Sequence, residues 1–213
     1  MIDWKRATRP LATAVLCTAM AASLQGCFTM AVGGAVMGTL AATDRRTLGA
    51  QTEDQEIELK GEARAANLVG GAGHVNVTSY NRRVLLTGEV RDDAMKQEVE
   101  RQIASIQGVQ SIVNELSVMG TTSFTSRSND TLITGKVKAA FVDTKDLYAN
   151  SIKVVTERGV VYLMGRVTQR EAQLAANVAS GVSGVQKVVK IFEYISEGDL
   201  QQLRQTPDNK GQK

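Results

Sequence analysis

An internal repeat constrains this chain more than any other feature of its sequence. At a shift of 77 residues, apolar and glycine positions in the first half coincide with similar residues in the second half: Val75, Val77, Val84, Leu86, Gly88 and Val90 fall on Ile152, Val154, Val161, Leu163, Gly165 and Val167. After one deletion the agreement continues at a shift of 76. Such a repeat predicts two homologous domains, domain 1 over residues 50–118 and domain 2 over residues 128–196, joined by a polar linker over 119–127.

Each unit has the same predicted order of elements. In domain 2, a helix over Asp130–Val142 is expected first, with Ser128 or Asp130 as its N-cap. Two strands with alternating apolar residues follow around a turn at 157–159, then a helix with alanines at three- and four-residue spacing, then a last strand over 185–195. We therefore predict an α+β fold of two tandem αββαβ domains, each a three-stranded sheet with two helices packed on one face.

The first 26 residues are typical of an export signal. Cationic residues precede an apolar run over 11–24, which is shorter than the roughly 20 residues that span a bilayer. The run ends in the letters LQGC, and this string resembles the bacterial lipobox, in which the cysteine is acylated and becomes the first mature residue. The resemblance implies a signal peptide over 1–26 and lipidation of Cys27. Phe28, where inner-membrane retention signals carry Asp, implies the periplasmic face of the outer membrane. A plain signal or an uncleaved anchor helix is the alternative.

The segments that flank the repeat differ in character. Residues 27–52 are rich in Ala and Gly, and we expect a membrane-proximal tether, which either lies against the bilayer or acts as a flexible linker. Residues 197–213 are polar and lack periodicity, so we expect a disordered tail.

Composition excludes several classes of function. The mature chain would hold 22 basic and 21 acidic residues, so it lacks the strongly basic face of a nucleic-acid-binding protein. Its only cysteine would be the acylated Cys27, and its only histidine is His74. We therefore expect no enzyme, no metal site and no cofactor besides the acyl chains. Residues 70–73, a glycine-rich run without the flanking residues of a phosphate-binding loop, are expected to be a connector.

Glycine–valine motifs recur at matching places in the two units. Gly88-Glu89-Val90 is followed further along by Gly108-Val109, and residues 165–167 and 184–185 repeat this pattern. The pattern resembles the G-x-V…G-V signature of the BON domain. Together with the signal, lipobox and tether, nearly the whole chain resembles the dual-BON-domain outer-membrane lipoproteins of proteobacteria. That resemblance implies binding of an anionic phospholipid such as phosphatidylglycerol by the second domain, recruitment to division sites and support of the outer-membrane barrier.

Charge separates the two copies. Domain 1 holds 7 basic and 11 acidic residues, a net charge of −4, whereas domain 2 holds 9 and 6, a net charge of +3. An anionic leaflet attracts basic surface. If either copy meets anionic lipid, we expect it to be domain 2, whose opening helix carries Lys136 and Lys138.

That helix also shows where lipid would be met. Ile133, Val137, Ala140 and Phe141 form the predicted core-facing stripe. Leu132 lies about 100° away, with Lys136 one turn further along, a pairing that suits a headgroup boundary. The candidate lipid-binding residues are Thr131, Leu132, Gly135, Lys136 and Ala139. The alternative is that Leu132 packs at the border of the stripe or between the domains. The family is expected to carry Trp where this chain has Leu132, a departure that bears on the strength of binding.

The sequence is also compatible with a second function. Domains of this kind could instead bind envelope assembly proteins, division proteins or cell-wall amidase regulators, without specific lipid binding. The Leu132–Lys136 face distinguishes the two hypotheses, because it should matter only for lipid.

Overall fold

The computed structural model describes residues 44–120 and 124–205. The predicted signal peptide, Cys27 and the tether up to residue 43 lie outside the described residues. The described part belongs to one compact unit that contains both copies of the repeat.

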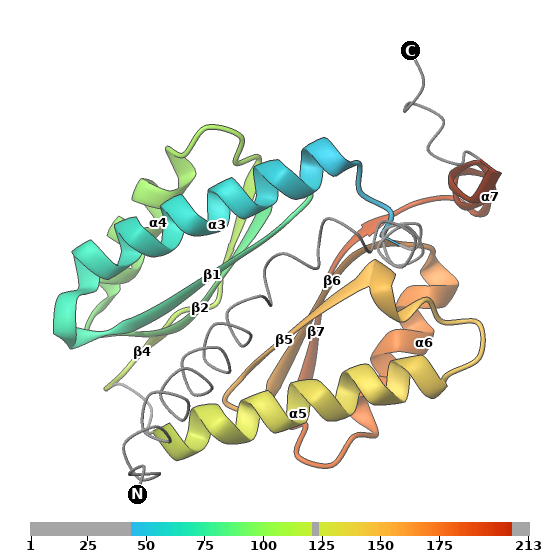
Figure 1. Cartoon of the computed structure of the whole chain (residues 1–213). Coiled ribbons are helices and arrows are strands. Elements are labelled where there is room, and N and C mark those ends of the chain that lie inside the picture. Colours follow the sequence, from blue (N-terminus) through green and yellow to red (C-terminus); the bar gives the residue numbers. More distant parts are fainter. Residues whose placement is uncertain (1–43, 121–123, 206–213) are drawn as a thin grey trace, which may run out of the picture. The chain divides into compact units, whose positions relative to one another are not determined.

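The predicted order of elements is confirmed in domain 2, and in domain 1 the last predicted strand is divided into two, which gives a four-stranded sheet (Figure 1). Domain 1 consists of α3 (Leu48–Val69), β1 (His74–Tyr80), β2 (Arg83–Val90), α4 (Asp93–Ala104), β3 (Ser111–Asn114) and β4 (Ser117–Val118). Domain 2 consists of α5 (Phe124–Asp143), β5 (Ile152–Glu157), β6 (Val160–Val167), α6 (Gln169–Ser180) and β7 (Lys187–Tyr194). A further helix, α7 (Glu197–Gln205), follows β7.

The two sheets have the same topology. In domain 1, β2 lies between an antiparallel β1 and a parallel β3, and β4 continues the parallel edge. In domain 2, β6 lies between an antiparallel β5 and a parallel β7. The two helices of each domain pack on one face of its sheet. The buried α5 stripe Ile133, Val137 and Phe141 shares a core with alanines of α6 and alternate residues of β5 and β6.

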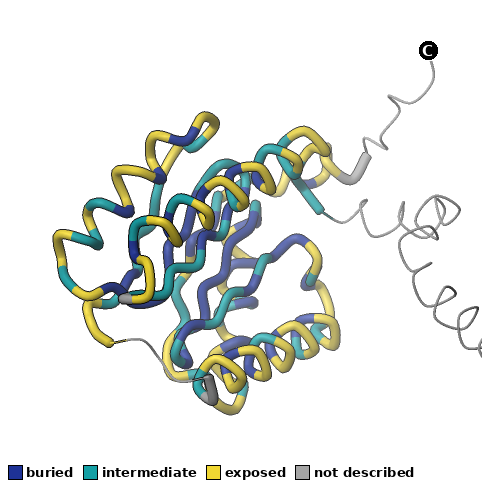
Figure 2. Tube along the Cα trace, turned by 60° about the vertical axis from the view of Figure 1, so that its left-hand side comes forward, coloured by how far each residue is buried: buried dark blue, intermediate teal, exposed yellow. Residues whose placement is uncertain are grey.

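The other face of each sheet is also buried, because the two sheets pack against each other. Tyr80 and Leu85 of domain 1 form one buried cluster with Tyr162, Met164 and Ile191 of domain 2. Figure 2 shows the strands largely buried and the outer sides of the helices exposed. The near-continuous apolar run of β6 is the sequence signal for this arrangement, since strands covered on both faces lose the alternation of apolar and polar residues.

One aspartate in each copy ties the first helix to the hairpin turn. The Asp130 carboxylate accepts hydrogen bonds from the amides of Arg158 (2.7 Å) and Gly159 (2.8 Å). Asp54, at the equivalent place in domain 1, accepts them from Asn81 and Arg82, both at 2.7 Å. Asn81, Arg82 and Arg158 have positive φ, which L-residues adopt at a cost, and the hydrogen bonds to the buried carboxylate compensate for it.

The signature glycine of each copy is required by a close approach of backbones. A Cβ atom on Gly88 would lie 2.0 Å from the carbonyl oxygen of His74 on the neighbouring strand, and Gly88 has φ of 114°. A Cβ atom on Gly165 would lie 2.5 Å from the carbonyl oxygen of Ser151. Any larger residue at these positions would force β1 or β5 away from its partner strand.

Four local expectations differ from the structure. Helix α3 begins at Leu48, with the Thr47 hydroxyl accepting from the Ala50 amide, so the end of the expected tether is helical. Helix α5 begins at Phe124, inside the expected linker, and Ser128 and Asp130 are therefore not its N-cap. Residues 197–205 of the expected disordered tail form α7, because the Ser196 hydroxyl caps the Asp199 amide and Leu200 is buried.

Candidate functional site

Helix α5 has two distinct faces. Ile133, Val137 and Phe141 are buried against the sheet, as the periodicity predicts, while Ala140 is half-buried at the border. Thr134, at the other border, shares a 2.7 Å hydrogen bond between its hydroxyl and that of Thr156 on β5. These contacts fix the rotation of the helix about its axis, so the remaining residues are held away from the domain core.

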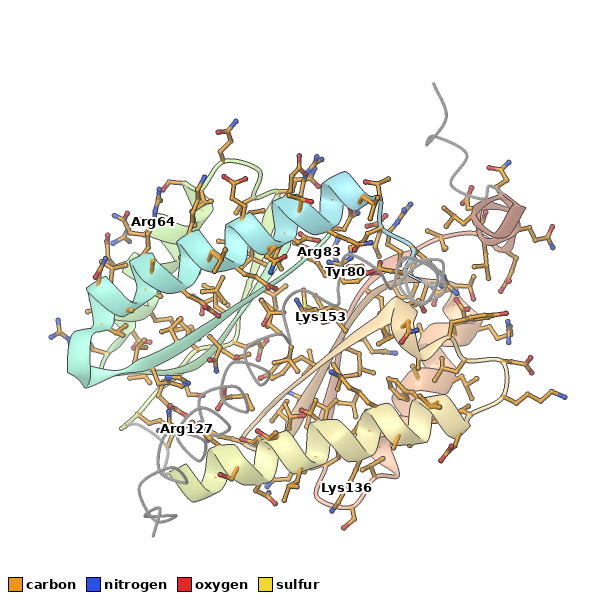
Figure 3. The ribbon with its side chains drawn as sticks, viewed as in Figure 1. Arg64, Tyr80, Arg83, Arg127, Lys136 and Lys153 are labelled. Carbon is orange, nitrogen blue, oxygen red and sulfur yellow. The ribbon has the colours of Figure 1, made fainter. Side chains whose placement is uncertain are left out.

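The structure brings the five candidate lipid-binding residues together on that outward face. Each of them is exposed: Thr131, Leu132, Gly135, Lys136 and Ala139. The side chain of Leu132 is 63% exposed, so it neither packs on the core stripe nor contributes to the contact between the sheets. In Figure 3, Lys136 projects from α5 on the side opposite to the strands.

Val142, which is not among the residues predicted to bind lipid, extends this face. Its side chain is 72% exposed, more than that of any other large apolar residue of the described chain. Val142 lies three residues beyond Ala139 and ten beyond Leu132, which places it on the same side of the helix. The helical spacing was therefore a sufficient signal. We name the set Thr131, Leu132, Gly135, Lys136, Ala139 and Val142 the α5 face.

The equivalent face of α3 is built differently. Shifted by 76 residues, Leu132 falls on Glu56 and Lys136 falls on Lys60. In α3, Lys60 makes an ion pair with Glu56 one turn earlier. In α5, the place of that glutamate is taken by Leu132, so the helix offers Lys136 an apolar neighbour instead of a counterion.

The chemistry of the α5 face is that of a surface contact and not of a reaction centre. Two exposed aliphatic side chains flank small residues, and Gly135 leaves open space around its Cα. Lys136 and Lys138 are exposed beside them. An apolar strip bordered by lysines can dip into the headgroup region while the ammonium groups stay hydrated. Within the described residues, no helix has the length and apolar content needed to cross a bilayer.

His74 and the glycine-rich run over residues 70–73, which were considered for metal or phosphate binding, occupy structural positions. His74 is the first residue of β1, and no group of three or more metal-binding side chains gathers anywhere in the part of the chain that the structure describes. Gly70, at φ of 54°, ends α3 and leads through a short 3-10 turn over Gly70–Ala72 into β1. The glycine-rich run is therefore a connector, as its sequence suggested.

Comparison with known proteins agrees with this architecture. The family model described as BON domain matches residues 54–120 and 129–195. The chain is 40% identical to the outer membrane lipoprotein DolP of Haemophilus influenzae over 175 residues. The aligned region covers 81% of this chain and 90% of that protein. The chain is 32% identical to the 21 kDa hemolysin of Actinobacillus pleuropneumoniae, over 71% of this chain and 79% of that one.

The chain is also similar to one further sequence relative and to one solved structure. The osmotically-inducible protein Y of Escherichia coli is 34% identical over 49% of this chain and 50% of its own length. Among solved structures, CdsD, a structural protein of the type III secretion system of Chlamydia trachomatis, aligns with 68% of this chain and 96% of that chain at 11% identity and a TM-score of 0.28.

Proposed function

This chain belongs to the BON-domain family, and one relative that it matches over most of its length is an outer membrane lipoprotein. We propose that this chain is also an outer-membrane lipoprotein, and that its second BON domain binds anionic phospholipid. Cys27 carries the acyl chains in this proposal, and the α5 face makes the second contact with the same leaflet. The protein is non-enzymatic and supports the integrity of the outer membrane at division sites. Phosphatidylglycerol is the lipid that we expect it to prefer.

The observation that carries this proposal is the pairing of Leu132 with Lys136. Leu132 is held out in solvent at 63% exposure, where burial in a headgroup region would remove its apolar surface from water. Lys136 is exposed one turn further along and would meet an anionic headgroup at the same depth. The +3 charge of domain 2 supports this orientation, since the −4 charge of domain 1 would be repelled by the same surface.

The acyl anchor makes a weak second contact effective. An α5 face with few apolar residues would bind vesicles by itself with modest affinity, which flotation at high lipid concentration can still detect. Once Cys27 is inserted in the leaflet, the same contact becomes intramolecular and benefits from a high effective concentration. At most about 60 Å of chain separates Cys27 from Asp44, at about 3.5 Å for each extended residue, so domain 2 stays close to the leaflet.

Co-flotation with liposomes tests the proposal. The chain from residue 28, made without its signal peptide and therefore not acylated, is mixed with vesicles of phosphatidylcholine alone or with added phosphatidylglycerol. We expect flotation only with the anionic vesicles, and a loss of about tenfold or more in Leu132→Asp and in Lys136→Glu. Leu59→Asp and Lys60→Glu on α3 are the matched controls, because Leu59 is as exposed as Leu132 and Lys60 is the counterpart of Lys136.

Each outcome has a defined meaning. Equal losses in the α3 and α5 variants would show that charge alone, and not the α5 face, determines the binding. Absence of flotation with either kind of vesicle would contradict lipid binding by the domains. The acyl anchor would then hold the protein by itself, and a role as an adaptor for envelope assembly proteins or amidase regulators would take its place.

A further inference from the structure

Two adjacent arginines just before α3 reach into different domains. Arg45 contacts Glu171 of domain 2, 126 residues later in the chain, whereas Arg46 contacts domain 1. These residues precede domain 1 in the sequence and lie on the side of the chain that leads to Cys27. We name the segment Asp44–Arg46 the strap.

Arg45 forms the most deeply buried ion pair of the described chain. Its guanidinium donates to both carboxylate oxygens of Glu171 on α6, at 2.6 and 2.8 Å, and to the carbonyl oxygen of Arg166 at 2.7 Å. The side chains of Arg45 and Glu171 are 7% and 1% exposed. Arg166 returns a hydrogen bond to the Arg45 carbonyl oxygen at 3.1 Å, and the Tyr148 ring lies 5.8 Å from the guanidinium carbon.

Arg46 makes the matching contacts with domain 1. Its guanidinium donates to Asp54 at 2.8 Å, the same carboxylate that holds the hairpin turn, and to Asp44 at 2.7 Å. The guanidinium carbon also lies 4.3 Å from the centre of the Tyr80 ring. Tyr80 belongs to the cluster between the sheets, and its hydroxyl donates to the Ser151 carbonyl oxygen of domain 2 at 3.3 Å. The strap therefore meets the contact between the domains at its edge.

The electrostatics of the Arg45 pair make it sensitive to the loss of either partner. Burial by itself would raise the pKa of Glu171. The hydrogen bonds from Arg45 and from the Thr168 amide outweigh this effect and hold that pKa below its ordinary value of 4.5. A buried carboxylate that loses its arginine becomes an uncompensated charge, which strongly disfavours the arrangement in which Glu171 stays buried.

The contact between the sheets combines an apolar centre with polar contacts at its edge. Its centre is apolar, and apolar contact is non-directional. At its edge, Asn76 donates to Glu157 at 3.1 Å and Asn81 donates to Glu193 at 2.6 Å. The ion pair between Lys153 and Glu58 is about one-third and one-quarter exposed, so water competes for it. The two-pronged pair between Arg45 and Glu171 is dry and directional.

We propose that the strap locks the angle between the two domains, with Arg45 as the positioning residue. The lock is part of the same segment that leads to the acylated Cys27. The angle at which the α5 face is presented is therefore set at the point where the anchored segment joins the folded unit. This inference stands on the contacts of the strap and does not require that the α5 face binds lipid.

Pulsed electron spin resonance on the mature chain tests the lock. Spin labels are placed at Ala63→Cys on α3 and Ala139→Cys on α5, two exposed and equivalent positions, in a chain that carries Cys27→Ser. We expect one narrow distance distribution in this reference protein. Arg45→Ala should at least double its width, and Glu171→Gln should widen it less, because an amide can still accept one hydrogen bond. Combining both changes should add little to Arg45→Ala alone.

Controls separate the lock from general loss of structure. Arg101→Ala removes an exposed ion pair within α4 and should leave the distribution unchanged. If Arg45→Ala fails to fold, as judged by circular dichroism, Glu171→Gln decides the question. A distribution as narrow as that of the reference protein in a folded variant would overturn the proposal. Because no lipid is present, this result is independent of the flotation experiment.

Discussion

Helices α3 and α5 descend from one repeated unit, yet they differ on both of their faces. On the outward face, α3 pairs Lys60 with Glu56, whereas α5 places Leu132 before Lys136. On the inward face, the buried Gly61 and Ala65 of α3 correspond to Val137 and Phe141 of α5. The two copies therefore share the order of elements up to the last strand and the aspartate at the hairpin turn, while the residues that decide packing distance and surface chemistry diverged.

The inward difference sets how closely each helix approaches its sheet. A Cβ atom on Gly61 would lie only 2.7 Å from a methyl carbon of Val77, so α3 packs tightly on β1. In domain 2, Val137 takes the place of Gly61 and the larger Phe141 takes the place of Ala65, and both side chains are completely buried. Domain 2 therefore depends on one large side chain where domain 1 depends on close backbone approach.

The largest effect is expected from removing that side chain. Phe141→Ala should lower the free energy of unfolding by about 3–5 kcal/mol, because it leaves a cavity in a small core. Thermal unfolding followed by circular dichroism measures this change. Ala65→Gly, at the equivalent position of α3, is the control and should cost about 1 kcal/mol through helix propensity. Similar losses in the two variants would show that the cores do not differ as described.

The aspartates at the hairpin turns should show the next largest effects. Asp130→Ala removes two hydrogen bonds to a charged acceptor and should cost about 2–3 kcal/mol. Asp54→Ala should cost more, because Asp54 also accepts from the Ser79 hydroxyl at 2.6 Å and pairs with Arg46. Chemical denaturation of both variants measures the difference. An equal or smaller cost at Asp54 would contradict the role given to Arg46.

Two buried glutamates of domain 2 should respond to pH in opposite directions. Burial raises the pKa of Glu157 above 4.5, with Glu89 adding to this effect and a hydrogen bond from Asn76 opposing it. The folded state then holds its proton more tightly than the unfolded chain, so ionisation of Glu157 lowers stability as the pH rises above about 4.5. Glu171 has a lowered pKa, so its contribution is present above 4.5 and is lost as the pH falls.

Neutral replacements test these signs. Glu157→Gln should be at least as stable as the original chain at pH 7, and its advantage should shrink toward pH 4. Glu171→Gln should be less stable at pH 7, with a deficit that shrinks below pH 4.5. Denaturant unfolding at several pH values measures both trends. Parallel pH profiles for either variant and the original chain would show that the corresponding carboxyl group does not contribute as described.

The smallest effect on stability is expected from a substitution that gives the outward face of α3 the leucine that α5 carries at the equivalent position. Glu56→Leu recreates the Leu132–Lys136 pairing next to Lys60 and removes one exposed ion pair, which should change stability by no more than about 0.5 kcal/mol. Its flotation with anionic vesicles should rise only slightly, because domain 1 stays acidic. A large gain in flotation would mean that this pairing is sufficient for binding in either domain.

Local patterns explain why much of the fold was predictable. The αββαβ order and the buried stripe of α5 follow from spacing within a few turns or one strand, whereas the spacing left open whether Leu132 is exposed or packed. The boundaries were less predictable: α5 begins at Phe124 and α7 was not expected at all, since short helices depend on caps and docking more than on periodicity. Lipid binding by the five predicted residues stays a prediction that the flotation experiment tests.

The duplication, the elements of each copy and the buried stripe of α5 were predictable, because each of these depends on the spacing of residues within one element or one repeat. Three features became visible only in the folded chain: the two sheets pack against each other, Asp130 holds a hairpin turn instead of capping a helix, and Arg45 reaches Glu171, 126 residues away. Contacts over such separations produce no periodic pattern in the sequence, because they depend on how complete domains pack against each other.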